Sequence, residues 1–209
     1  MRIRRGWLAA LGLASLVGAG EAAAVSVLDV TLDVRFGSRA TGHFARLSIE
    51  ETGDGGLEFT VRLLEALGSR ADMDELYFNL PSSVRGLEVE TLGDVETPFE
   101  VETGPSVHGG AGSDFDVAVS FGSGRGRNGN GQLQVARFVL RADQPLSLAA
   151  LLAEASETSQ GIESHFAVHT QGSRGGGSTV GGFVIPEPAT ALLAGTGLLG
   201  LALFGRRRL

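Results

Sequence analysis

Two histidines lie four residues apart near the end of the chain, at His165 and His169. The residues around them alternate as in a strand, and on a strand this spacing puts both rings on one face, about 13 Å apart. One metal ion cannot bridge that distance, so a zinc site would need support from His43 or His108. We expect both histidines to be exposed, with the apolar residues between them facing inward, and we predict no metal site.

A glycine-rich stretch followed by acids is the second group that could do chemistry. Residues 109–114 read GGAGSD and match the start of a calcium-binding β-roll repeat. The repeat occurs once and has Asp116 where a large apolar residue belongs, whereas a β-roll needs stacked copies. A single calcium ion on Asp114 and Asp116 stays open as an alternative, because calcium prefers several oxygen ligands. The favoured interpretation is that both carboxylates are solvated on the outer face of a strand.

Patterns for a cofactor or for catalysis are weak. Residues 124–129 fit G-x-G-x-x-G, but the segment after them is a predicted strand and not the helix N-terminus that a pyrophosphate needs. No G-x-S-x-G occurs, and we interpret the carboxylate pairs Asp72/Asp74 and Glu88/Glu90 as solvated surface groups. The chain has no cysteine and no lysine, which excludes thiol and Schiff-base chemistry. We therefore predict a non-enzymatic protein without a cofactor.

The elements that must position these residues are short strands with two-residue alternation of apolar and polar side chains. They are predicted at residues 25–36, 45–49, 57–63, 75–80, 86–92, 99–103, 114–121, 133–140 and 164–170, with a turn at 52–56. Only Ser147–Ala155 reads as a helix, with Ser147 as its N-cap. The pattern predicts an all-β body at residues 25–171, an antiparallel β-sandwich with one short helix.

The charge of this body limits its partners. Residues 25–185 hold 11 arginines against 22 aspartates and glutamates, a net charge of −11. Such a surface repels nucleic acid, so we expect no nucleic-acid partner. A carbohydrate-binding face usually needs exposed aromatic platforms. Tyr77 is the only tyrosine, and the only tryptophan lies in the N-terminal segment, which weakens the case for such a face.

The first 24 residues have the pattern of a secretory signal peptide. Arginines open the segment, an apolar stretch follows, and Ala22 and Ala24 mark a small-residue cleavage site that we place after Ala24. We therefore expect the secretion translocon and signal peptidase as partners, and export of the body.

The C-terminal end carries the most specific pattern. Pro186, Glu187 and Pro188 precede an uncharged apolar run from Ala189 to Phe204, which is predicted to be a transmembrane helix. At about 1.5 Å per residue the run spans roughly 24 Å, slightly short of the hydrocarbon core. Three arginines then close the chain and are costly to translocate: Arg206, Arg207 and Arg208. We therefore predict a provisional membrane span, with the body outside the cytoplasm.

This triplet, helix and arginine cluster resemble the PEP-CTERM sorting signal of Gram-negative bacteria. The resemblance implies recognition at residues 186–209 by an exosortase, a membrane-embedded cysteine protease, with cleavage near the triplet. It also implies association with the cell surface or an exopolysaccharide matrix in a biofilm. An ordinary C-terminal membrane anchor is the alternative, although it leaves the triplet unexplained.

Residues 172–185 are rich in glycine and serine, and we predict a flexible tether there. The whole pattern predicts an exported protein that is paused in the inner membrane with its body in the periplasm, then processed and released to the surface or matrix. The alternative is a polysaccharide-binding or polysaccharide-modifying module that uses the same route.

Overall fold

The structure is a computed structural model that describes residues 27–36, 41–93, 98–108, 114–122, 132–158, 161–172 and 178–182. The predicted signal peptide with Ala22 and Ala24, the loop 124–129 and the C-terminal segment 183–209 lie outside the described residues.

Strands dominate the described part of the chain. They are β1 (Val27–Arg35), β2 (Thr41–Glu51), β3 (Leu57–Leu63), β4 (Asp72–Phe78), β5 (Glu88–Thr91), β6 (Glu100–His108), β7 (Asp114–Ser120), β8 (Val135–Arg141), β9 (Ser156–Glu157), β10 (Glu163–Ser164), β11 (Phe166–Gln171) and β12 (Ser178–Gly182). A 3-10 turn η1 (Glu65–Leu67) and one short helix α1 (Leu148–Leu151) complete the set. The all-β prediction is confirmed, and within the described residues no helix is long and apolar enough to cross a membrane.

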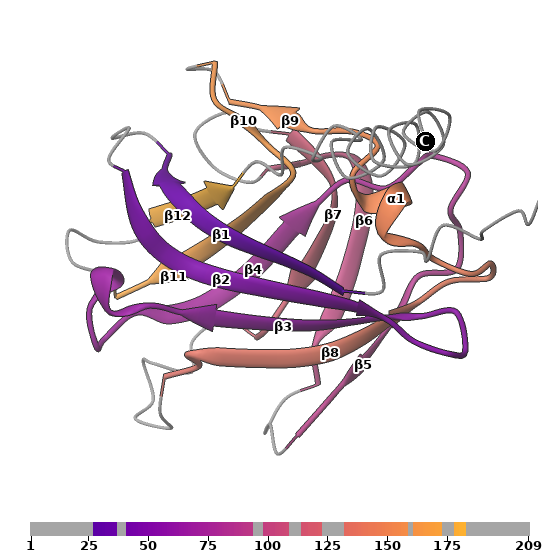
Figure 1. Cartoon of the computed structure of the whole chain (residues 1–209), viewed down its shortest axis with the longest axis horizontal. Coiled ribbons are helices and arrows are strands. Elements are labelled where there is room, and N and C mark those ends of the chain that lie inside the picture. Colours follow the sequence, from indigo (N-terminus) through magenta and orange to yellow (C-terminus); the bar gives the residue numbers. More distant parts are fainter. Residues whose placement is uncertain are drawn as a thin grey trace, which may run out of the picture.

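Ten strands form one antiparallel sheet in the order β5-β8-β3-β2-β1-β12-β11-β4-β7-β6, while β9 and β10 form a separate hairpin. Strands β2, β3 and β8 cross in front of β4, β6 and β7, so the sheet is strongly curved (Figure 1). The two edges approach each other, since the Phe99 amide beside β6 donates to Thr91 Oγ1 of β5 across 2.7 Å. The sheet is thus nearly closed into a barrel-like shape.

The core lies inside this curve because alternate residues of each strand are apolar and point inward. The ring of Phe59 on β3 stacks on Phe138 of β8 at 4.8 Å and on Phe78 of β4 at 5.5 Å, so it links the two halves of the sheet. All three side chains are fully buried. Burial of such large aromatic surfaces is the main favourable contribution to folding.

A smaller apolar cluster covers part of the outer face. It consists of Phe36, Tyr77, Phe115, Ala118 and Ala167, with Val107 and Ile162 packed against it. The alternation of the first strand predicts that Phe36 faces the main core. The structure instead places it outside. The β1–β2 register is irregular between Leu32 and Val34, and beyond this point Arg35, rather than Val34, pairs with the core residue Val180, so Phe36 faces away from the main core.

The β-sandwich prediction is wrong in one respect. The two facing layers exist, but β12 pairs with both β1 and β11 and joins them into a single sheet. Without β12, strands β1 and β11 would be edges of two separate sheets. The tether prediction is therefore also wrong for Ser178–Gly182, which form this joining strand and are mostly buried.

Two local predictions hold. The β2–β3 turn closes with the Thr52 amide donating to the Gly56 carbonyl at 2.9 Å. Ser147 caps α1 by accepting a bond from the Ala150 amide at 3.3 Å, although the helix ends at Leu151 rather than at residue 155. It stops early because Ser156 pairs with Ser164 in the β9–β10 hairpin and its hydroxyl donates to the Asp114 carbonyl.

Candidate functional site

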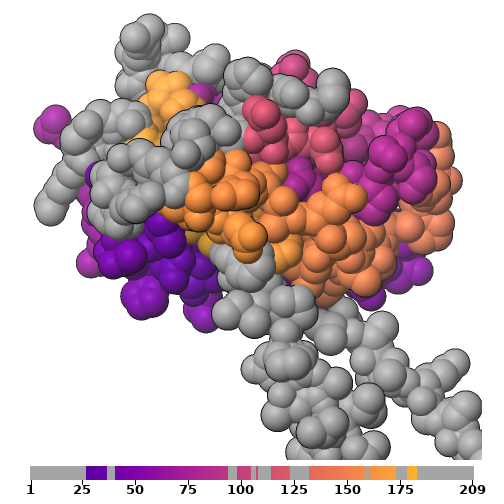
Figure 2. All heavy atoms as spheres, turned by 90° about the horizontal axis from the view of Figure 1, so that it is seen from above, coloured from indigo at the N-terminus to yellow at the C-terminus, as the bar shows by residue number. Residues whose placement is uncertain are grey.

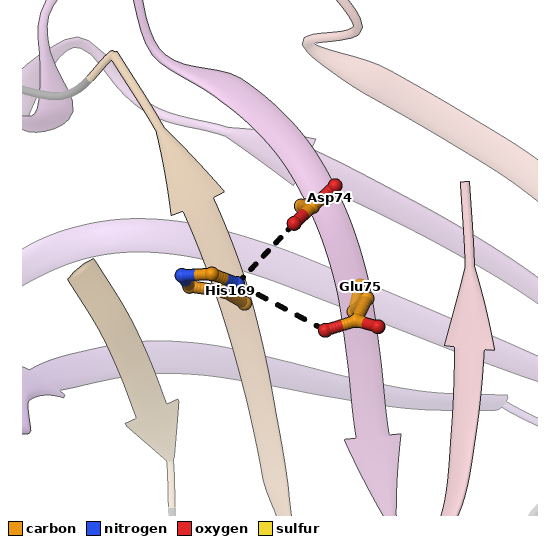
Figure 3. Close-up of side chains that lie close together, drawn as sticks. All are labelled: Asp74, Glu75 and His169. Atoms are coloured by element: carbon orange, nitrogen blue, oxygen red, sulfur yellow. Dashed lines mark ion pairs between the residues drawn. The ribbon is translucent and has the colours of Figure 1, made fainter. Parts of the chain in front are cut away.

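An acid–histidine cluster, formed by Asp74, Glu75 and His169, lies on the outer face of the sheet. His169 on β11 pairs with Glu75 of β4, but the next pair is Thr170 with Met73, so Asp74 is an extra residue on β4. A bulge of this kind leaves two successive residues opposite one partner. It allows both carboxylates to turn toward the same imidazole, as Figure 3 shows.

The atoms of this cluster are close but not in hydrogen-bond contact across the strands. His169 Nδ1 lies 3.4 Å from Asp74 Oδ2 and 3.9 Å from Glu75 Oε2. The exposed fractions of the side chains are 14% for Asp74, 31% for Glu75 and 34% for His169. Among the described residues, these three form the one group of histidine and acidic side chains that could hold a metal ion.

Two further side chains orient the carboxylates. Gln171 Nε2 donates to Asp74 Oδ2 at 2.9 Å, and the Tyr77 hydroxyl donates to Glu75 Oε2. Burial, together with this bond and the charge of Glu75, raises the pKa of Tyr77 far above its usual range. Tyr77 therefore stays a neutral hydrogen-bond donor at any physiological pH.

His165 contradicts the prediction that both histidines are exposed. It is 4% exposed, since it precedes β11 at the end of the sheet where α1 and the β9–β10 hairpin lie. Residues 142–158, orange in Figure 2, form the surface there beside the indigo first strands. Burial lowers the pKa of His165, against the opposing effects of a hydrogen bond with the Leu152 backbone and the charge of Glu163. His43 is exposed on β2, and the described residues offer no metal-binding group that contains it.

The other predicted carboxylates have mixed outcomes. Glu88 and Glu90 are exposed on the edge strand β5, as predicted. The interpretation of the pair on β4 as solvated is wrong: Asp72 is half-buried and accepts a bond from the Leu133 amide at 2.7 Å, and Asp74 is the most buried member of the cluster. Asp114 is exposed, as predicted.

Aromatic side chains do not form a platform on the described surface. Tyr77 is 4% exposed and stacks on Phe115 at 5.8 Å. The one large apolar side chain exposed within the described residues is Val27. An open pocket of about 390 Å³ beside residues 80–87 is lined by aliphatic and polar side chains, Arg85 and Asp116 among them.

Strand β12 connects the body to the C-terminal segment. The Gly182 carbonyl accepts bonds from the His165 amide and the Ser164 hydroxyl, both at 3.1 Å. The neighbouring glycine is required by packing, because a Cβ on Gly181 would lie 2.4 Å from the Phe36 ring. Only Phe183 separates this strand from the segment that begins at Val184.

That segment is the part of the chain that matches a known family. Residues 184–208 match the family model described as the PEP-CTERM protein-sorting motif. The chain carries a PEP-CTERM protein-sorting motif. No curated protein and no solved structure matches the chain.

The PEP-CTERM motif implies an exported, membrane-sorted protein that is processed by an exosortase. The predicted motif residues Pro186, Glu187 and Pro188 and the arginines Arg206, Arg207 and Arg208 fall within the match but outside the described residues.

Sequence reasoning missed the acid–histidine cluster. The i, i+4 histidines drew attention to His169, but its partners lie about 95 residues earlier, at Asp74 and Glu75. The signal that was available is the Asp72–Glu75 segment, where two successive acids interrupt the two-residue alternation and indicate a bulge.

Proposed function

We propose that this PEP-CTERM protein is a non-enzymatic, exported protein of the cell surface or exopolysaccharide matrix. The observation that carries the proposal is the match at residues 184–208. Secretion by an N-terminal signal peptide with cleavage after Ala24 fits the same route. In this proposal the all-β body acts as the cargo that the C-terminal motif sorts.

The proposal includes where the cut falls relative to the fold. Strand β12 ends at Gly182 and is required to join the two halves of the sheet. Cleavage before Ser178 would remove that strand, whereas cleavage near Pro186 retains it. The chain allows at most about 14 Å between Gly182 and Pro186, so the protease acts on the signal close to the folded body.

The test is the intact mass of the exported protein from a host with and without an exosortase. Processing near the triplet removes the apolar run and the arginine cluster together, while the residues through Gly182 remain. We expect Glu187→Ala, or deletion of residues 206–208, to leave precursor in the membrane. Glu88→Ala, an exposed acid on β5, is the matched control and matures normally. A mature protein that still carries its arginine end would contradict the proposal.

A polysaccharide-binding or polysaccharide-modifying module delivered by the same route is the competing function. The pocket beside residues 80–87 is the hollow that favours it, with Arg85 and Asp116 as polar groups for a sugar. A glycan array and a hydrolase screen on the mature exported protein decide between them. Saccharide binding that Arg85→Ala removes would support the module.

A further inference from the structure

We propose that Asp74, Glu75 and His169 bind one divalent transition-metal ion of the zinc class on the outer face of the sheet. This site lies on the body, and it does not depend on the sorting of the C-terminal segment. The three side chains come from two paired strands, β4 and β11, and their ligand atoms all lie within 4.8 Å of one another.

The donor set selects the class of ion. One imidazole nitrogen and two carboxylate oxygens suit zinc and its neighbours in the first transition series. Calcium and magnesium prefer oxygen ligands alone, so the imidazole argues against them. Three protein ligands leave at least one position of a tetrahedral ion for water or for a group from another molecule.

The separations fit a metal site better than a hydrogen bond. The distances of 3.4 and 3.9 Å from His169 Nδ1 to the two carboxylates exceed the usual N–H···O range. Two ligands bound at about 2.0–2.1 Å in a tetrahedron lie about 3.3–3.4 Å from each other. The His169–Asp74 pair already has this separation, and the distance from His169 Nδ1 to Glu75 Oε2 is about 0.5 Å longer. All three ligand atoms lie within 4.8 Å of one another, so small side-chain rotations bring them to one ion.

The charge around the cluster is unbalanced without a cation. Asp74 and Glu75 are neighbours on one face, and the charge of Glu102 on β6 also acts on the adjoining Tyr77. Within the described residues, no arginine forms an ion pair with Asp74 or Glu75, and His169 is their sole ion-pair partner. A divalent ion at this position offsets the charges of both carboxylates.

The surrounding hydrogen bonds have the form of an outer shell. Gln171 donates to the Asp74 carboxylate and Tyr77 to the Glu75 carboxylate, and each bond limits the rotation of a ligand. Such outer partners typically change metal affinity by 10–100-fold when they are removed. The bound ion would also tie β4 to β11, next to the strand that joins the two halves of the sheet.

The experiment titrates Zn²⁺ into the full chain, purified in detergent, and follows heat by calorimetry. We expect one ion per chain. His169→Gln should lower the affinity by about 100-fold and Tyr77→Phe by roughly 10-fold. His43→Gln, which removes an exposed histidine from β2, should leave the affinity within about twofold. Co²⁺ should give tetrahedral visible absorption that His169→Gln abolishes.

Two results would overturn the proposal. One is the absence of saturable Zn²⁺ binding by the wild-type chain, and the other is binding that His169→Gln leaves unchanged. Circular dichroism checks that each variant is folded. If His169→Gln does not fold, Asp74→Asn carries the same test, because an asparagine keeps an acceptor for Gln171 while it loses the anionic ligand.

Discussion

His165 and His169 stand four residues apart on either side of the start of β11, and their surroundings differ in packing and in charge. His165 is 4% exposed, and its amide bonds to the last residue of β12, so it belongs to the place where the sheet is joined. His169 has a side chain that is 34% exposed and faces two carboxylates across the β4 bulge. One end of the strand is held by close packing, and the other holds a polar cluster that can bind.

A substitution in β12, the strand that joins β1 to β11, should give the largest loss of stability. We predict that Gly181→Val destabilises the protein by about 3 kcal/mol, because a Cβ there would lie 2.4 Å from the Phe36 ring and 2.7 Å from Ser164 Oγ. Thermal unfolding followed by circular dichroism measures the change.

The matched control for this prediction is Gly53→Ala in the β2–β3 turn. No atom lies within 4 Å of a Cβ built on Gly53, so we expect a change within about 0.5 kcal/mol. If both variants unfold at the same temperature, β12 is not packed into the sheet.

Replacing the buried His165 should change the pH dependence of stability, an effect of intermediate size among these predictions. Because burial lowers the folded-state pKa of His165 below its ordinary value of 6.5, the unfolded chain binds a proton more readily than the folded one. The contribution of the neutral His165 ring to the free energy of unfolding is fully present above pH 6.5. It is lost as the pH falls through the lower folded-state pKa. We predict that His165→Gln flattens the fall in unfolding temperature between about pH 7 and pH 5.

The exposed His43 provides the comparison for this pH series. His43→Gln should keep the wild-type slope, since its ring is not packed in the body. Equal slopes for wild type and His165→Gln would mean that His165 is not buried as a neutral ring.

The strands that carry these residues were largely predictable, and the connection between them was not. Alternation placed β3 and β7 within a residue of their bounds because each has one face in the core. It failed at β12, where Ser178–Gly182 contains two glycines and reads as a linker. Glycine is needed there because Phe36 and Leu32 leave no room for a side chain, and single-strand patterns carry no information about such neighbours.

The candidate sites divide in the same way. The sorting motif is contiguous, so its order of proline, acid, apolar run and arginine is visible in the chain itself. The acid–histidine cluster depends on the register of β4 against β11 and on a one-residue shift within it. Spacing along one strand predicted about 13 Å between the two histidines, but it could not supply a partner from another strand.

The polar end of β11 should give the smallest effect on stability, and this sharpens the contrast between the two histidines. Without added metal, we predict that His169→Gln changes the free energy of unfolding by less than about 1 kcal/mol, because partly exposed ion pairs contribute little. Urea unfolding at pH 7 measures this change. With saturating Zn²⁺ the wild-type chain should gain stability and the variant should not, since an ion that binds only the folded state shifts the equilibrium toward it. If His169→Gln lowered the free energy of unfolding strongly in the absence of metal, His169 would instead be a packing residue like His165, and its contacts would hold the sheet together.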